Sequence, residues 1–189
     1  RDETLGVPYC SRVCCMYAIK QAMLLAGALP LADITIYYMD IRTFGKGYEQ
    51  FYQNAKAMGI EFVKGKVARI TEGDDQGLFV RLEVIDDAPR VVERSHDLVV
   101  LSVGMLPAVD ATGALRGVPT DVDGFLRLGD PNISPAATPQ EGLFATGAAA
   151  GPMDIVDTIV SAGAAAAEVG AHLRARRDVA SATIDVPHR

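Results

Sequence analysis

Three cysteines within six residues constrain this chain more than any other feature of its sequence. Cys10, Cys14 and Cys15 form a C-x3-C-C pattern, and the rest of the chain contains no cysteine. Free thiols are liable to oxidation and to metal capture, so such a concentration is rarely an accident of packing. Thiolates are also the usual ligands of iron–sulfur clusters. The pattern therefore favours an iron–sulfur cluster near the start of the chain.

Other interpretations of the three cysteines stay open. A structural zinc site normally adds a second Cys or His pair, and the three histidines have unrelated positions far along the chain. A disulfide between Cys14 and Cys15 would be strained and would leave Cys10 unexplained. A thioredoxin-like pair requires C-x2-C, which is absent. Three buried thiols on one helix are the structural alternative. For a cluster, three ligands are one short of the usual four, so a fourth comes from elsewhere or one iron stays open.

Composition excludes several classes of protein. The 189 residues are 49% hydrophobic, enough for one large or two small domains. No apolar run approaches the roughly 18–20 residues of a membrane span, and the first residues do not form a signal peptide. A net charge of −6 without a basic stripe argues against a nucleic-acid partner. The odd number of cysteines argues against a secreted disulfide framework and favours the cytoplasm. A start without Met suggests a piece of a longer protein.

Residues 10–103 carry the pattern of an α/β domain. Ser11 is expected to cap a first helix, while Gly27 and Gly59 are expected to end the first and second helices. Turn residues at 73–77 and 86–89 predict an antiparallel β-meander, and the apolar run DLVVLSV predicts a buried strand of a parallel sheet. These elements predict a Rossmann-like, nucleotide-type domain with a β-meander. The expected helices are 10–26 and 47–58, and the expected strands are 34–41, 60–71, 78–85, 90–94 and 97–103.

Residues 104–189 are organised differently. A boundary is expected at 104–107, followed by a stretch rich in Gly, Pro, Asp and Thr. Short strands are predicted at 124–128 and 142–146. A long helix should then begin at Pro152 or Met153 and end near Arg176, followed by a frayed tail.

A run of small residues joins the last predicted strand to the long helix. Small side chains such as Gly147 and Ala148 let a cofactor approach the backbone, and a helix N-terminus offers free N–H groups to an oxygen ligand. Pro152 and Asp154 are equally explained as ordinary residues of a helix start. The chain has no G-x-G-x-x-G, so a complete dinucleotide fingerprint is absent.

Asp40 lies near the end of the expected strand 34–41, which follows the cysteine helix and is where such a domain would have a ribose-binding acid. The glycines that would cradle a pyrophosphate are missing, because the cysteines occupy the corresponding turn and helix start. We therefore interpret Asp40 and Arg42 as structural or interdomain residues.

Several segments together resemble the A subunits of heterodisulfide reductases, a family that includes quinone-interacting and sulfur-oxidation relatives. The resemblance spans nearly all of residues 1–175, and the CSRVCCMY string is highly specific. The segments are 9–20 (YCSRVCCMYAIK), 37–42 (YYMDIR), 48–52 (YEQFY), 97–105 (DLVVLSVGM) and 147–157.

The resemblance implies two cofactors and a domain plan. Cysteines matching Cys10, Cys14 and Cys15 bind a [4Fe–4S] cluster in that family, with a fourth cysteine just upstream of the residue that matches Arg1. The family core is similar to thioredoxin reductase, an FAD domain interrupted by a nucleotide-type domain. Residues 1–103 would then be the inserted domain with the cysteines, residues 104–176 the closing segment of the split FAD-binding domain, and residues 177–189 a flexible tail.

The resemblance also suggests residues near the flavin. Backbone N–H groups are the expected contacts, because Ala148 stands where the family's second flavin motif usually has an Asp. Lys20 follows the cysteines on the same helix, where a cation between cluster and flavin would raise the electron affinity of the flavin; a plain surface lysine is the alternative. The cofactor-side candidates are Gly147, Ala148, Pro152, Met153, Asp154 and Ile155.

We therefore expect an FAD- and iron–sulfur-dependent oxidoreductase subunit that passes electrons to sister subunits of a heterodisulfide-reductase-like complex, with a homodimer also considered. The fragment alone is expected to be inactive. Two alternatives stay open: a pyridine-nucleotide disulfide oxidoreductase that uses a pair of cysteines, and a non-catalytic module that docks to sister subunits.

Overall fold

The computed structural model of the chain describes residues 4, 6–73, 77–86, 88–108 and 117–182. The chain divides into two compact units. We call residues 13–104 the sheet unit, and residues 1–12 together with 105–189 the helix unit. The predicted turn residues 74–76 and 87, and the end of the predicted tail, 183–189, lie outside the described residues.

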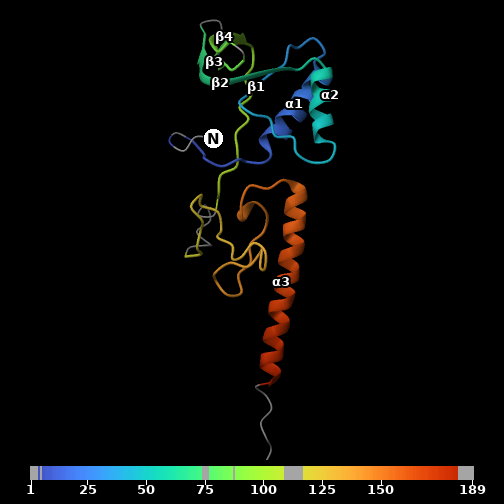
Figure 1. Cartoon of the computed structure of the whole chain (residues 1–189), viewed down its shortest axis with the longest axis vertical. Coiled ribbons are helices and arrows are strands. Elements are labelled where there is room, and N and C mark those ends of the chain that lie inside the picture. Colours follow the sequence, from blue (N-terminus) through green and yellow to red (C-terminus); the bar gives the residue numbers. More distant parts are fainter. Residues whose placement is uncertain (1–3, 5, 74–76, 87, 109–116, 183–189) are drawn as a thin grey trace, which may run out of the picture. The chain divides into compact units, whose positions relative to one another are not determined.

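The sheet unit contains a four-stranded mixed sheet with the order β1-β2-β3-β4 (Figure 1). β1 (Thr35–Tyr38) runs parallel to β2 (Glu61–Glu72), with Thr35 opposite Glu61. β3 (Leu78–Val84) and β4 (Arg90–His96) continue the sheet with antiparallel pairing. The predicted α/β class and its β-meander are thereby confirmed, and the sheet is compatible with a Rossmann-like domain.

Two helices pack with the parallel part of the sheet. α1 (Cys14–Ala28) precedes β1, and α2 (Tyr48–Ala57) connects β1 to β2 (Figure 1). Burial of apolar surface between these elements stabilises the unit by about 25 cal/mol per Å². The buried side chains of this first apolar cluster are Ile19, Ala22, Ala55 and Ile60.

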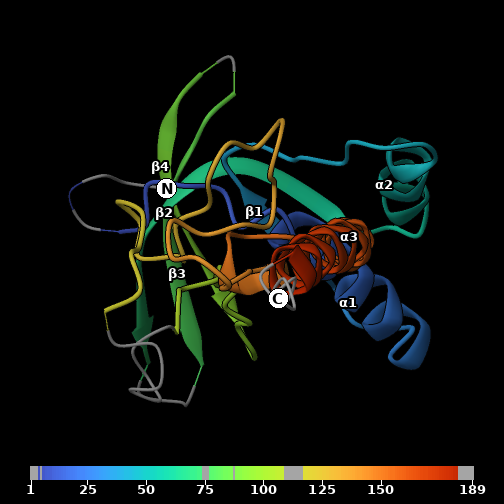
Figure 2. The same ribbon diagram turned by 90° about the horizontal axis from the view of Figure 1, so that it is seen from below.

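A second apolar cluster lies on the antiparallel part of the sheet. β2 is long and curved (Figure 2), and its register with β3 shifts between Val67 and Arg69. Every second position of β3 from Val80 to Val84 is apolar, so the side chains of Val80, Leu82 and Val84 share one face of the sheet and are buried there. The cluster comprises Val63, Val80, Leu82 and Val84, with Tyr37, Val92 and Val99 packed against it.

The first helix begins later than predicted. α1 starts at Cys14 with Val13 at the N-cap, and no side chain caps it, so the prediction of a start at Cys10 under a Ser11 cap is wrong. The reason is Arg12, whose φ of +63° is incompatible with a right-handed helix and separates Cys10 from α1. Gly27 does not end α1 either, because the helix continues through Ala28. Gly59, by contrast, has the predicted left-handed conformation, with φ +88°.

Residues 97–103 do not form the predicted buried strand. No ladder includes them among the described residues, and Leu98 is 70% exposed. A strand requires a hydrogen-bonded neighbour, and a covered apolar face requires a packing partner. Here Val99 packs against the second cluster, but Leu101 and Val103 are largely exposed. An apolar composition is therefore insufficient to make this segment a strand.

The helix unit consists of loops, the 3-10 turn η2 (Gly147–Ala149) and the long helix α3 (Ile155–Ala182). Figure 1 shows the loops of residues 117–154 following one another beside the first half of α3. The predicted strands at 124–128 and 142–146 are wrong, since only the isolated bridges Thr120–Leu126 and Ala137–Phe144 form among the described residues. α3 also begins later than Pro152 or Met153 and continues beyond Arg176.

Candidate functional site

The cysteine segment crosses the boundary between the two units. Cys10 belongs to the helix unit, whereas Cys14 and Cys15 begin α1 of the sheet unit. All three are free thiols of intermediate burial. Within the part of the chain that the structure describes, no three His, Cys, Asp or Glu side chains are grouped so as to hold a metal ion. The three thiols are therefore suitable ligands for an iron–sulfur cluster, but among the described residues they are not arranged as a metal site.

Each of the two cysteines of α1 makes one hydrogen bond to a later segment of the sheet unit. The Cys15 thiol donates a weak hydrogen bond to the carbonyl oxygen of Asp40, with an S···O distance of 3.9 Å. The Ser102 hydroxyl donates to the carbonyl oxygen of Cys14 at 3.4 Å. Burial raises the pKa of the Cys15 thiol above its ordinary value, and the adjacent Cys14 adds to the rise. A thiol held neutral in this way is a poor nucleophile until a cation or metal lowers its pKa.

Cys10 lies in a turn that is tied to the helix unit. The backbone N–H of Arg12 donates a hydrogen bond to the Cys10 sulfur, with an N···S distance of 3.4 Å. The Arg12 guanidinium forms an ion pair with the carboxylate of Asp157, in the first turn of α3. Ahead of this turn, the Tyr9 hydroxyl donates to the carbonyl oxygen of Met105 at 2.9 Å. Burial raises the pKa of Tyr9, so this phenol stays a hydrogen-bond donor at neutral pH.

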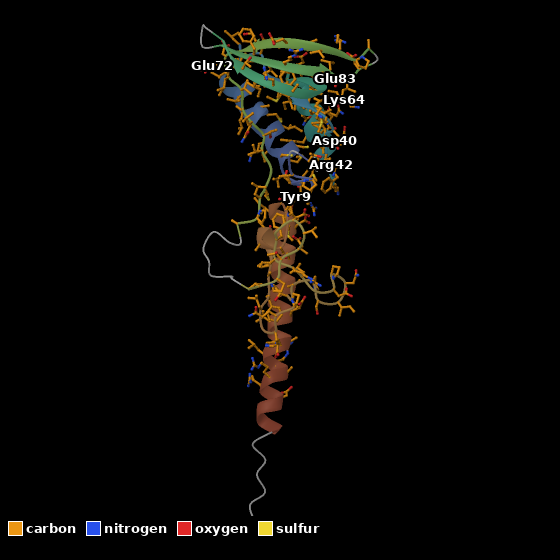
Figure 3. All side chains as sticks on the ribbon, turned by 90° about the vertical axis from the view of Figure 1, so that its left-hand side faces the viewer. Tyr9, Asp40, Arg42, Lys64, Glu72 and Glu83 are labelled. Atoms are coloured by element: carbon orange, nitrogen blue, oxygen red, sulfur yellow. The ribbon has the colours of Figure 1, made fainter. Side chains whose placement is uncertain are left out.

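Asp40 and Arg42 lie next to one another just after β1 (Figure 3). Their side chains form an ion pair with an N···O distance of 3.1 Å. The Asp40 carboxylate therefore contacts a cation of its own chain. This contact is consistent with the structural role inferred from the sequence.

The glycine-rich segment is anchored to α3 by polar side chains. Thr146 and Ser161 share a hydrogen bond between their hydroxyls at 2.7 Å, and the Gly147 N–H donates to the Ser161 hydroxyl at 3.4 Å. Gly147 has φ +62°, and a Cβ there would lie 3.1 Å from the Thr158 Cγ2. A side chain at this position would therefore be both strained and crowded. Ala148 and Ala149 of η2 are exposed, whereas Gly147 is buried.

Asp154 has a structural role at the start of α3 that requires no cofactor. Its carboxylate accepts the Asp157 N–H at 2.8 Å, which is the hydrogen bond of an N-cap residue. Pro152 and Met153 precede the helix with intermediate burial, and Ile155 is 79% exposed. Lys20 is an exposed residue of α1. The roles suggested for these residues toward a flavin stay predictions.

Sequence reasoning assigned no role to three contacts of this region. They are the Arg12–Asp157 ion pair, the Ser161 anchor of Thr146, and the Tyr9 hydrogen bond. No local pattern could have revealed them, because each joins residues that are well separated along the chain.

Comparison with known proteins identifies the relatives of the chain. It is 44% identical over 172 residues to the A subunit of the H(2):CoB-CoM heterodisulfide,ferredoxin reductase of Methanothermobacter thermautotrophicus, with 88% of this chain and 26% of the relative covered. It is 43% identical over 181 residues to the second iron-sulfur A subunit of the CoB--CoM heterodisulfide reductase of Methanopyrus kandleri, with 93% and 27% covered. The chain belongs to the family of heterodisulfide reductase A subunits.

A third relative carries a similar name. The iron-sulfur A subunit of the CoB--CoM heterodisulfide reductase of Methanocaldococcus jannaschii is 40% identical over 175 residues, with 89% of this chain covered. The chain spans about a quarter of the length of these relatives. No protein-family model matches it. Among the described residues, none of the helices has the length and apolar character needed to cross a membrane.

Proposed function

We propose that this chain is the part of a heterodisulfide-reductase-like A subunit that binds a [4Fe–4S] cluster and faces FAD. Cys10, Cys14 and Cys15 would supply three thiolates, and a cysteine upstream of Arg1 the fourth. The observation that carries the proposal is the set of three free, half-buried thiols in a relative of proteins named iron-sulfur subunits. Their donor chemistry fits a cluster.

The flavin-side role rests on the exposed residues Ala148 and Ala149 of η2 and on the residues that lead into α3. Gly147 and Ala148 have no bulky side chain, and the Thr146–Ser161 hydrogen bond holds their backbone against α3. The Gly147 N–H already donates to Ser161, so the N–H groups of Ala148 and of residues 153–155 are the better candidates for contacts with FAD. FAD, when bound, supplies two-electron chemistry, and the cluster supplies one-electron transfer to a sister subunit.

The chain's own residues would set how readily electrons are accepted. Hydrogen bonds to cysteine sulfurs and partial burial tune the potential of an iron–sulfur cluster. The Arg12 N–H supplies such a hydrogen bond to Cys10. Lys20 would act through its positive charge on the same helix as Cys14 and Cys15. We place this electron transfer in the cytoplasm.

The proposal is tested by iron and acid-labile sulfide analysis of anaerobically purified protein that extends upstream of Arg1. We expect about four of each per chain, lost in Cys14→Ala and kept in the neighbouring control Val13→Ala. Absence of both, with every thiol titratable, would refute the cluster. Thiol-alkylation sensitivity without iron would then favour a disulfide oxidoreductase.

A non-catalytic docking role is the second candidate. The exposed apolar side chains Ile155, Val156, Ile159 and Val160 recur along one side of the first turns of α3. Large exposed apolar residues in such a row suit contact with the surface of another protein, here one of the sister subunits. Normal assembly of the complex around a Cys14→Ala variant without iron, with an unchanged electron-transfer rate, would favour this candidate. A homodimer stays a prediction.

A further inference from the structure

The turn that carries Cys10 has an unusual backbone. Among the described residues other than glycine, Arg12 alone has a positive φ, +63°. Residues with a Cβ populate this region sparsely and persist there only where their surroundings hold them. Ser11, directly before it, is buried, with 6% of its surface exposed. The structure around residues 10–12 must therefore contain a contact that maintains this conformation.

The ion pair with Asp157 is the contact best placed to do so. It joins the Arg12 guanidinium to the Asp157 Oδ2, an oxygen that is itself shielded from solvent. Asp157 is held in turn, because its N–H donates to the Asp154 carboxylate at the start of α3. The anchor of Arg12 is thus a capped first helical turn.

Within the same turn, the Arg12 N–H donates a hydrogen bond to the Cys10 sulfur at 3.4 Å. A hydrogen bond to a ligand sulfur stabilises the more negatively charged, reduced form of a cluster and so raises its reduction potential. Losing this hydrogen bond would lower the potential. Removing a nearby negative charge, in contrast, would raise it.

We propose that the Arg12–Asp157 ion pair is a positioning contact for Cys10. It holds the Cys10–Arg12 turn against the first turn of α3 and keeps the Arg12 N–H on the Cys10 sulfur, which raises the potential of the cluster. The link to potential rests on the proposed function, whereas the anchoring of the turn does not. Arg12 and Asp157 are positioning residues and need not touch a cofactor.

The anchoring is tested by a double-mutant cycle in the full-length protein without cluster. Arg12→Ala, Asp157→Ala and the double variant are compared by hydrogen exchange of the peptide that contains residues 9–13. Each single change should speed exchange roughly two- to fivefold, the range for a partly exposed ion pair. The double variant should add nothing further, and Arg12→Lys should stay near the original rate. Additive effects, or no change, would overturn the anchor.

The link to Cys10 is tested by an EPR-monitored redox titration of the loaded protein. Asp157→Ala removes a negative charge, so a purely electrostatic role predicts a higher midpoint potential. Our proposal predicts a lower one, because the N–H···S hydrogen bond is lost. A raised or unchanged potential would overturn the link. If the original protein contains no iron, the proposed function fails, and hydrogen exchange still decides the ion pair. Asp157→Asn replaces Asp157→Ala in both experiments if the latter does not fold.

Discussion

The two units of this chain differ in how much strand pairing and clustered apolar burial they contain. The sheet unit has a hydrogen-bonded ladder of four strands and two clusters of buried aliphatic side chains. The described part of the helix unit has one long helix, two isolated bridges and loops. Polar contacts such as Thr146–Ser161 join the loops to α3, and a few apolar side chains such as Phe125 and Leu126 are buried. Repeated apolar burial is worth more free energy than isolated polar contacts. Mutations in the two units should therefore differ in how much they change stability.

The largest effect is expected from a cavity in the sheet unit. Leu82 is fully buried at the centre of β3, and Leu82→Ala should lower the free energy of unfolding by about 2–5 kcal/mol. Leu98→Ala is the matched control, because Leu98 is mostly exposed and should change stability by no more than about 0.5 kcal/mol. Urea unfolding followed by circular dichroism measures both. Equal losses would show that Leu98 is covered in solution.

A pair of glycines tests how tightly the sheet unit is packed at two of its positions. A Cβ at Gly65 in β2 would lie 2.5 Å from the backbone oxygen of Glu83, so Gly65→Ala should cost about 1–3 kcal/mol. Gly27 in α1 has nothing within 4 Å of its Cβ position, so Gly27→Ala should stabilise by about 0.5–1 kcal/mol. Melting temperatures should move in opposite directions. A fall for both variants would contradict the open space beside Gly27.

In the helix unit, the cap of α3 should be worth less than the core of the sheet unit. Asp154→Ala removes the acceptor of the Asp157 N–H and should cost about 1 kcal/mol, whereas Asp154→Ser keeps a capping oxygen and should cost less. Hydrogen exchange of the first turn of α3 reports the loss directly. A stability loss in the sheet unit as large as in α3 would show that the two units unfold together.

The smallest effect concerns a surface ion pair between strands. The hydrogen bond from Arg94 to Glu61, at 2.7 Å, lowers the pKa of Glu61, and the Thr35 hydroxyl adds to this. A carboxyl with a lowered folded pKa stabilises the fold above its unfolded pKa, and this contribution disappears as pH falls through the folded value.

Because the Glu61 side chain is 50% exposed, solvent screening should limit the contribution to less than about 1 kcal/mol at neutral pH. Urea titrations at neutral and acidic pH should show a slightly smaller acid loss for Glu61→Gln than for the original chain. Identical acid losses would mean that the ion pair contributes nothing.

Much of the sheet unit followed from the sequence. Alternating apolar residues placed β2, β3 and β4 within two residues of their observed ends, because a strand with one buried face alternates with a period of two. Gly59 was recognisable as a helix end because a glycine in the left-handed conformation commonly ends a helix in this way. The family was also recognisable, chiefly from the CSRVCCMY string.

The errors fell where local preference was overruled by distant contacts. The 97–103 run has the composition of a buried strand, yet it lacks a neighbouring strand among the described residues and stays exposed. Ser11 has the chemistry of a helix cap, but the left-handed Arg12 after it prevents the helix from starting there. Local propensity is a weak prior that tertiary contacts override.

The sequence by itself determined which thiols are available, the order of helices and strands in the sheet unit, and the family. These depend on residue type and on short-range periodicity. Only the tertiary structure decided that Arg12 meets Asp157, that Ser161 anchors Thr146, and that Cys10 and Cys14 belong to different units. Such contacts join residues far apart in the chain, and their free energy arises only when folding has already brought both partners together.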